Sequence, residues 1–297
     1  MCLLVIDRIR SNTFLICEPC CVTIVLTQHG SRNSFMTRYL KLLRVFYKAS
    51  LLTELEYRAN FVVNLIFSIG WTFWIWFGVA VFFQHTDSLA GWSYYEALVV
   101  VGMFQMFSGL IEAFLRPNLQ AIVEHIRKGT LDFVLLKPVD SQFFVSTRQV
   151  VFWKLLDMSV GFAVVAFALS RLGVTPDPAT VLLFVGMILL ATIMLYAVWI
   201  SLITSAFWFV RVDNISELLY SFFEAGRFPV TVFNGVIRFV LTFVVPIAFM
   251  TTFPAAVLLD RLDVRYLWLG VLLAAVLFAG CVWFWRFALR HYTSASS

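Results

Sequence analysis

Long apolar runs with almost no charge constrain this chain more than any other feature of its sequence. A helix needs about 20 predominantly apolar residues to cross the hydrocarbon core of a bilayer. Six runs meet this length, at about residues 59–83, 94–115, 150–169, 179–209, 230–250 and 266–288. Only 13% of the residues are charged, against about 25% in soluble domains. The sequence therefore predicts an all-α polytopic membrane protein with six transmembrane helices.

The segments that flank these spans differ from one another. Residues 37–58 place basic side chains on one helical face and apolar ones largely on the other, which favours a helix lying in the membrane interface. A solvated stalk before the first span is the alternative. Before the last span, Pro246 and Pro254 interrupt an apolar run that is too short for another crossing. We expect a broken or re-entrant piece there.

The N-terminal residues 1–35 lack the order of a signal peptide, whereas Met36 opens a basic amphipathic stretch. We expect residues 1–35 to be an extension and residues 36–297 to form a single membrane domain. The extension holds a Cys-Glu-Pro-Cys-Cys run. No second ligand pair with the spacing of a zinc site follows it, so we expect neither a metal ion nor a bound cofactor in this chain.

Lys and Arg are distributed unevenly among the loops, and this predicts the orientation. They are frequent before the first span, between the second and third spans and at the C-terminus, and absent from residues 84–93. Because cytoplasmic loops are rich in Lys and Arg, both termini are expected in the cytoplasm. The net charge of +5 has the same origin. No basic stripe with stacking aromatic residues lies outside the spans, so we expect the bilayer and not a nucleic acid as partner.

The segment between the second and third spans predicts a compact cytoplasmic elbow over residues 118–138. Pro117 suits the first turn of a short helix, and Gly129 suits its end. Pro138 ends a second amphipathic piece. An elbow joined at both ends to membrane helices is suited to transmit a push from a cytoplasmic partner.

The second half of this elbow carries a recognisable pattern. Its residues are Gly129, Thr130, Leu131, Asp132, Leu135, Leu136 and Pro138. The run resembles the signature of type-2 ABC transporter (ABC-2) permeases, which have Gly-Thr-Leu-acidic, two or three apolar residues and then Pro between spans two and three. The acidic residue is Asp where Glu is common. The resemblance covers residues 36–290 and is closer to a bacterial subgroup whose substrates are largely unassigned.

The resemblance implies a permease subunit of an ATP-driven exporter in the bacterial inner membrane. In that family the elbow docks on a separate ATPase subunit, which holds ATP and Mg²⁺, and two permeases pair as identical or sister chains. This chain has no Gly-x4-Gly-Lys-Ser/Thr phosphate loop, so we do not expect it to be an enzyme. Leu131, Val134 and Leu135 share one helical face. We expect this face to contact the ATPase, with Phe133 and Leu136 turned away.

Charged residues near the span ends are spaced to form pairs. Glu112 and Arg116 are four residues apart, and Lys154 and Asp157 are three apart. An unpaired charge at the bilayer centre costs about 2.5–3.5 kcal/mol, so we expect two ion pairs; a proton relay is the alternative. Arg238 is expected to anchor the inner end of the fifth span, or else to face an anionic substrate.

A secondary transporter or channel without an ATPase partner is the main alternative function. It would need paired ionisable residues near mid-span and an internal repeat, and the sequence shows neither clearly. A membrane enzyme would need His, Asp or Glu clustered at the membrane face. The sequence indicates neither the substrate nor whether the permease pair is homomeric.

Overall fold

The structure is a computed structural model that describes residues 34–56, 58–208 and 213–292. Nearly all of the predicted extension, with its cysteine run, lies outside the described residues. The chain divides into two units, Met1–Arg44 and Val45–Ser297. The boundary falls within helix α1 (Ser34–Glu56), so the described part of the first unit is the beginning of α1. All other described helices belong to the second unit.

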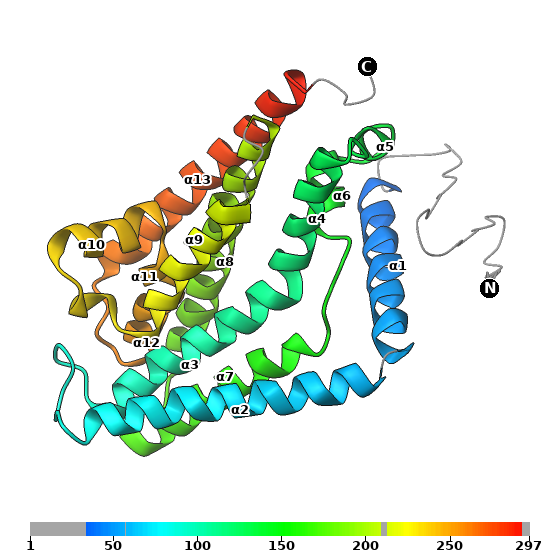
Figure 1. The fold of residues 1–297 in the computed structure, drawn as a ribbon. Helices are drawn as coiled ribbons and strands as arrows, with labels where there is room; N and C mark the ends of the chain where they lie inside the picture. Colours follow the sequence, from blue (N-terminus) through cyan, green and yellow to red (C-terminus); the bar gives the residue numbers. More distant parts are fainter. Residues whose placement is uncertain (1–33, 57, 209–212, 293–297) are drawn as a thin grey trace. The chain divides into compact units, whose positions relative to one another are not determined.

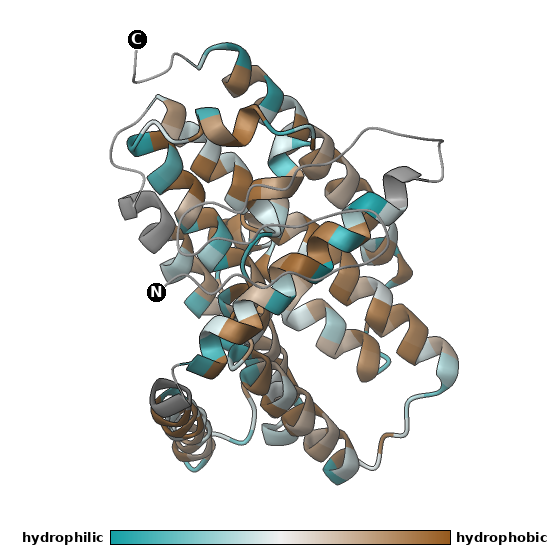
Figure 2. Ribbon diagram, turned by 90° about the vertical axis from the view of Figure 1, so that its right-hand side faces the viewer, coloured by the Kyte–Doolittle hydropathy of each residue, from teal (hydrophilic) through white to brown (hydrophobic). Residues whose placement is uncertain are grey.

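The described part of the second unit is helical, with one isolated bridge between Leu89 and Trp92 and no strand. The helices that are long and apolar enough to cross a membrane are α2 (Arg58–Phe83), α3 (Tyr94–Leu110) with its continuation, α7 (Lys154–Leu172), α8 (Pro178–Thr204) and α13 (Val264–Arg290). Figure 2 shows these long helices coloured mainly as hydrophobic. The predicted all-α polytopic membrane fold is confirmed.

Helix α3 packs against α7 with the two backbones almost touching. A Cβ atom added to Gly161 would lie 2.5 Å from the Met106 amide nitrogen, and one added to Gly109 would lie 2.5 Å from that of Met158. Only glycine permits this approach, which is the usual way that membrane helices gain van der Waals contact. The α3–α7 pair forms the tightest packing in the described chain, and α2 lies beside it (Figure 1).

Helices α8 and α13 form a second pair and run side by side along their length (Figure 1). Aromatic side chains join them at the end where α8 stops. Phe207, just after α8, lies with its ring centroid 5.9 Å from that of Trp285 and 5.5 Å from that of Tyr292. The next helix, α9 (Asp213–Glu224), then runs back towards α3, where Phe223 stacks on Phe104.

The segment before α13 is broken at Pro246, one of the two positions that the proline pattern predicted. It comprises α10 (Gly235–Phe239), η5 (Val240–Val244), α11 (Ile247–Met250) and α12 (Thr252–Leu258). The two halves meet at Pro246 with a bend of 69°. The expectation of one span over residues 230–250 is therefore wrong in its continuity, because Pro246 has no N–H to extend the helix.

Both ends of this broken segment lie at the same end of the second unit. The Trp92 indole donates to Thr231 Oγ1 at 3.2 Å, and Arg261 forms an ion pair with Glu96 at 2.6 Å. Because Trp92 and Glu96 are neighbours at the start of α3, the chain enters and leaves the broken segment there. Arg238 donates to the Thr231 carbonyl at 2.7 Å, so it also lies at this Trp92 end. Its expected roles, as an anchor of the inner end of the fifth span or as a contact for an anionic substrate, stay predictions.

Candidate functional site

The predicted elbow is the direct continuation of α3. A π-helical turn, η1 (Ile111–Leu115), joins α3 to α4 (Arg116–Arg127), and α4 ends in a left-handed glycine. Gly129 has a φ of 66°. The Thr130 amide donates to the His125 carbonyl at 3.0 Å, and the Gly129 amide donates to the Ile126 carbonyl at 3.2 Å. This pair of bonds closes the helix end and needs a residue that adopts positive φ without strain. The chain thus turns sharply before the rest of the elbow.

The short helix α5 (Asp132–Leu135) presents a buried side and an exposed side. Leu131 is completely buried within the chain and Val134 is 4% exposed, whereas Phe133 is 69% and Leu136 81% exposed. The expectation that Leu131 and Val134 contact a partner is therefore wrong, because this chain already covers them. The Leu135 side chain is partly exposed, at 38%. Phe133 and Leu136 offer the accessible apolar surface of the elbow.

The following helix, α6 (Ser141–Ser146), ties the elbow to α8 and α13. The Tyr196 hydroxyl of α8 lies 3.1 Å from Gln142 Nε2 and 2.9 Å from Ser146 Oγ. The Trp285 indole of α13 donates to Ser141 Oγ at 3.3 Å. These partners fix α6 against two membrane helices, so the elbow cannot move independently of them.

Two remaining elbow residues lie at its edges. Pro138 is exposed in the turn between α5 and α6. Asp132, the first residue of α5, lies near Tyr292, which follows α13. Burial and, to a lesser extent, the Asp132 carboxylate raise the pKa of Tyr292. The end of α13 and the elbow are therefore at the same end of the second unit, and we call this the elbow end.

A backbone carbonyl of the π turn between α3 and α4 accepts a hydrogen bond from the segment before α7. The Val151 amide donates to the Ala113 carbonyl at 2.9 Å. Buried Asn118 completes the connection: its Nδ2 donates to the carbonyls of Phe114 and Gln149, and its Oδ1 accepts from the Gln149 amide, each at 2.7 Å. The π turn and the entry to α7 are thus held together as one joint.

Helix α1 contributes the caps for the start of α7. Glu54 Oε1 accepts from the Phe152 amide at 2.7 Å, and Ser50 Oγ accepts from the Val150 amide at 3.3 Å. A carboxylate suits the amide-rich beginning of a helix. Burial raises the pKa of Glu54, while the bonds from the backbone amides oppose that shift. Sequence reasoning missed this role; the only signal for it was the presence of two acidic residues, Glu54 and Glu56, at the end of an otherwise basic helix.

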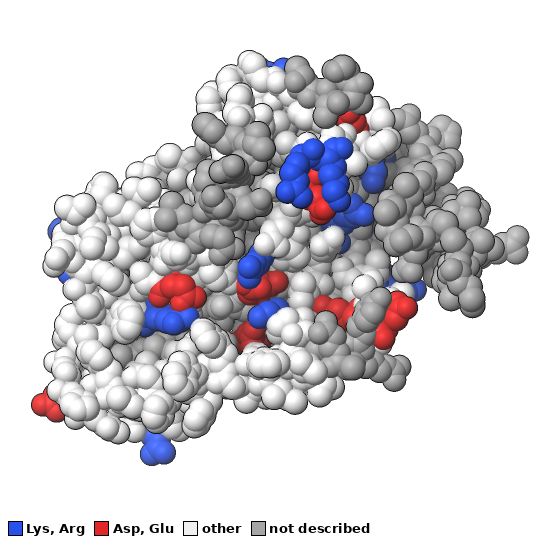
Figure 3. Space-filling view, in the orientation of Figure 1, with Lys and Arg blue, Asp and Glu red and all other residues white. Residues whose placement is uncertain are grey.

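The four charged residues singled out by spacing lie at the base of the elbow. Arg116 Nη1 contacts Glu112 Oε1 at 2.6 Å, and Lys154 Nζ contacts Asp157 Oδ2 at 3.3 Å. Tyr220 of α9, which sequence reasoning missed, donates its hydroxyl to Glu112. The Tyr220 contact joins α9 to the π turn before α4, whereas the Lys154–Asp157 pair lies within α7. Figure 3 shows the same pairing across one face of the molecule, where the few charged side chains lie mostly in small groups that contain both acidic and basic residues.

The described residues contain no group of three or more His, Cys, Asp or Glu side chains placed to hold a metal ion. The arrangement of the site is suited to transmitting a movement. An exposed apolar tip on α5 is rigidly joined to α3 through α4, and to α8 and α13 through α6. A force applied to Phe133 and Leu136 would reach three membrane helices.

Comparison with known proteins agrees with this geometry. Residues 69–296, more than half of the chain, match the model of a family described as ABC-2 family transporter protein. Neither a curated protein nor a solved structure matches the chain. The matched region contains every element of the elbow and all the membrane helices from α3 onwards. The chain is therefore an integral membrane protein that belongs to the ABC-2 transporter family, as a permease component.

Proposed function

We propose that this permease is the membrane subunit of an exporter driven by a separate ABC ATPase, which docks on the exposed side of α5. The observation that carries the proposal is the pair of exposed apolar side chains, Phe133 and Leu136, at the tip of an otherwise anchored elbow. Exposed apolar residues on a rigid, partly polar segment are typical of protein contact sites. The buried Leu131 and Val134 hold α5 in place and leave its other side for the partner.

ATP-driven closure of the ATPase would push on α5 and so on the helices tied to it. Rigid-body movement of packed helices is a common way to switch between two states. The bonds from α6 to Tyr196 and Trp285 support such a movement, because they couple the push to α8 and α13. ATP and Mg²⁺ would be bound by the ATPase.

A second permease, identical or a sister chain, would complete the pathway. Exposed apolar side chains along α2 and α13 support this assignment, since such faces suit either lipid or another membrane helix. Export across the bacterial inner membrane, with both termini and the elbow in the cytoplasm, agrees with the distribution of Lys and Arg. The elbow end would then be the cytoplasmic end and the Trp92 end the outer one.

Docking can be tested by co-purification of the permease with its cognate ABC ATPase. The variant carries Phe133→Ser and Leu136→Ser. Burial of each such side chain stabilises a contact by about 1.5–3 kcal/mol, so affinity should fall about tenfold or more per residue. Val236→Ser is the matched control, because Val236 is 80% exposed and lies in α10, near the Trp92 end. Unchanged ATPase binding and coupled hydrolysis in the double variant would refute the docking site on α5. Absence of ATPase binding by the unmodified permease would instead favour a transporter or channel without an ATPase.

Orientation can be tested by cysteine labelling in a cysteine-free background. Ser88→Cys, between α2 and α3, should react with a membrane-impermeant reagent added outside intact cells. Thr130→Cys, in the elbow, should react only after permeabilisation. Labelling of position 130 from outside would contradict the proposed orientation.

A further inference from the structure

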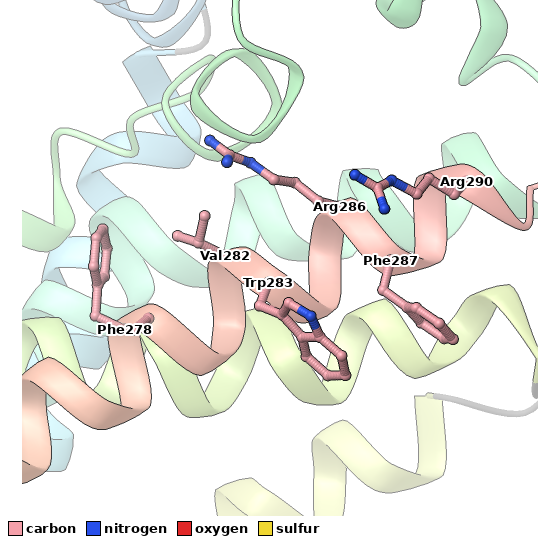
Figure 4. Close-up of a pocket in the computed structure, with 7 residues that line it drawn as sticks. Phe278, Val282, Trp283, Arg286, Phe287 and Arg290 are labelled. Carbon is pink, nitrogen blue, oxygen red and sulfur yellow. The ribbon is translucent and has the colours of Figure 1, made fainter.

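The last turns of α13 carry a groove that no part of the coupling machinery uses. It has a volume of about 460 Å³. Figure 4 shows its two edges: Phe278, Val282, Arg286 and Arg290 project on one side of the helix, and Trp283 and Phe287 on the other. The first four residues are spaced four apart and therefore form one stripe along the helix. The stripe is cationic near the helix end and apolar further along.

The two arginines of this groove differ from three other arginines of the described residues in having no acidic partner. Arg116, Arg227 and Arg261 each form an ion pair with a glutamate of this chain. Arg286 and Arg290 are exposed and have no acidic partner among the described residues. Each guanidinium group is a planar, multidentate donor that suits a phosphate, and Arg286 and Arg290 lie one turn apart near the end of an apolar helix.

We propose that this groove binds an anionic phospholipid. The phosphate would lie between Arg286 and Arg290, and an acyl chain would run past Val282 to Phe278. The eight residues from Arg286 to Phe278 span about 12 Å along the helix. This direction leads from the elbow end into the apolar centre of α13, as a lipid in the adjacent leaflet would lie. Basic sites on membrane helices at the cytoplasmic boundary are known to select anionic headgroups.

Two other occupants fit the groove less well. A second copy of this chain related by a twofold axis through the groove would bring four guanidinium groups together, and the described residues nearby supply no acid to balance them. A soluble partner could reach Arg290 but not Phe278, which lies about 18 Å further along a transmembrane helix. Only a lipid has a charged head and an apolar chain in the order that the stripe requires.

The experiment uses the purified full-length permease in an uncharged detergent. Native mass spectrometry would measure binding of phosphatidylglycerol and of phosphatidylethanolamine to the unmodified chain and to the Arg286→Gln, Arg290→Gln double variant. We expect selective phosphatidylglycerol binding, weakened about 30-fold in the double variant. Arg265→Gln is the control, because it removes an exposed charge from the opposite end of the same helix. The elution volume of each variant reports its folding.

Four outcomes would overturn the proposal. Equal phosphatidylglycerol binding by the double variant would place the lipid elsewhere, and an equal loss in Arg265→Gln would show only non-specific charge attraction. Displacement of the lipid by millimolar inorganic phosphate would indicate a simple anion site. A shift from dimer to monomer in the double variant, with lipid binding unchanged, would identify the groove as an interface between copies. The Phe278→Ser variant adds a further check: it should weaken long-chain more than short-chain phosphatidylglycerol.

Discussion

Helices α2 and α3 are equally apolar in mean hydropathy, yet they have opposite surroundings. In the most apolar part of α2 only 11% of the residues are buried within the chain, against 78% in that of α3. Their glycines explain the difference. An added Cβ at Gly70 or Gly78 of α2 would meet nothing within 4 Å, whereas at Gly102 or Gly109 of α3 it would collide with α7. Hydropathy selects a helix for the membrane, and the contact made by small residues decides whether it faces lipid or protein.

The largest effect should come from removing this close approach. Gly161→Val would place side-chain atoms against the backbone of α3, where neither helix can yield without separating. We expect a loss of stability of about 3 kcal/mol or more, and therefore little folded protein. Gly78→Val, on α2, is the control and should leave the yield almost unchanged. Fluorescence-detected size-exclusion chromatography after heating measures how much folded protein remains for each of the two variants. Equal tolerance of the two variants would mean that α3 and α7 do not pack as described.

A smaller effect is expected from the charge pair that this buried interface contains. Lys154→Ala would leave the Asp157 carboxylate without its partner, in a position that is only 9% exposed. The cost should be about 2.5 kcal/mol. Exchanging the two residues should restore part of the folded yield. If Asp157→Ala is instead neutral in yield but abolishes transport, the residue acts in transport and not in packing.

The smallest effect concerns the one buried side-chain hydrogen bond described between α2 and α3. Gln105 Nε2 donates to Thr72 Oγ1 at 3.2 Å. Interhelical bonds of this kind contribute about 0.6 kcal/mol in membranes, so Gln105→Leu should lower stability by about that amount. Thr72→Val, alone and combined with it, completes a double-mutant cycle. A coupling energy near zero would show that α2 is held to α3 by other contacts.

The local signals of the elbow could be read from sequence because they depend on backbone chemistry. Gly129 takes the left-handed conformation that ends a helix, and Pro117 lies in the first turn of α4. The outward face of α5 could not be read in the same way. Helical spacing places Leu131 and Val134 together, but their burial depends on packing within the folded chain, not on period. Helical spacing therefore predicts the wrong side of α5 for Phe133 and Leu136, which face outwards.

The contacts that hold the site together were also beyond sequence reasoning. Tyr220 lies 108 residues from Glu112 along the chain, and Glu54 lies 98 from Phe152. Neither spacing nor composition indicates such pairs. The glycines of α3 are different: Gly102 and Gly109, seven residues apart, lie on one face of a helix and would have predicted its buried side.

The π turn between α3 and α4 has a mechanical consequence. It is a fixed point, since the Ala113 carbonyl is bonded to the entry of α7, and two rigid arms extend from it. The 12 residues of α4 make an arm of about 18 Å, and the 17 residues of α3 one of about 25 Å. Such a lever multiplies displacement by the ratio of its arms. Because α3 touches the backbone of α7 at Gly109 and Gly161, a movement of the elbow tip would carry α7 along with the far end of α3.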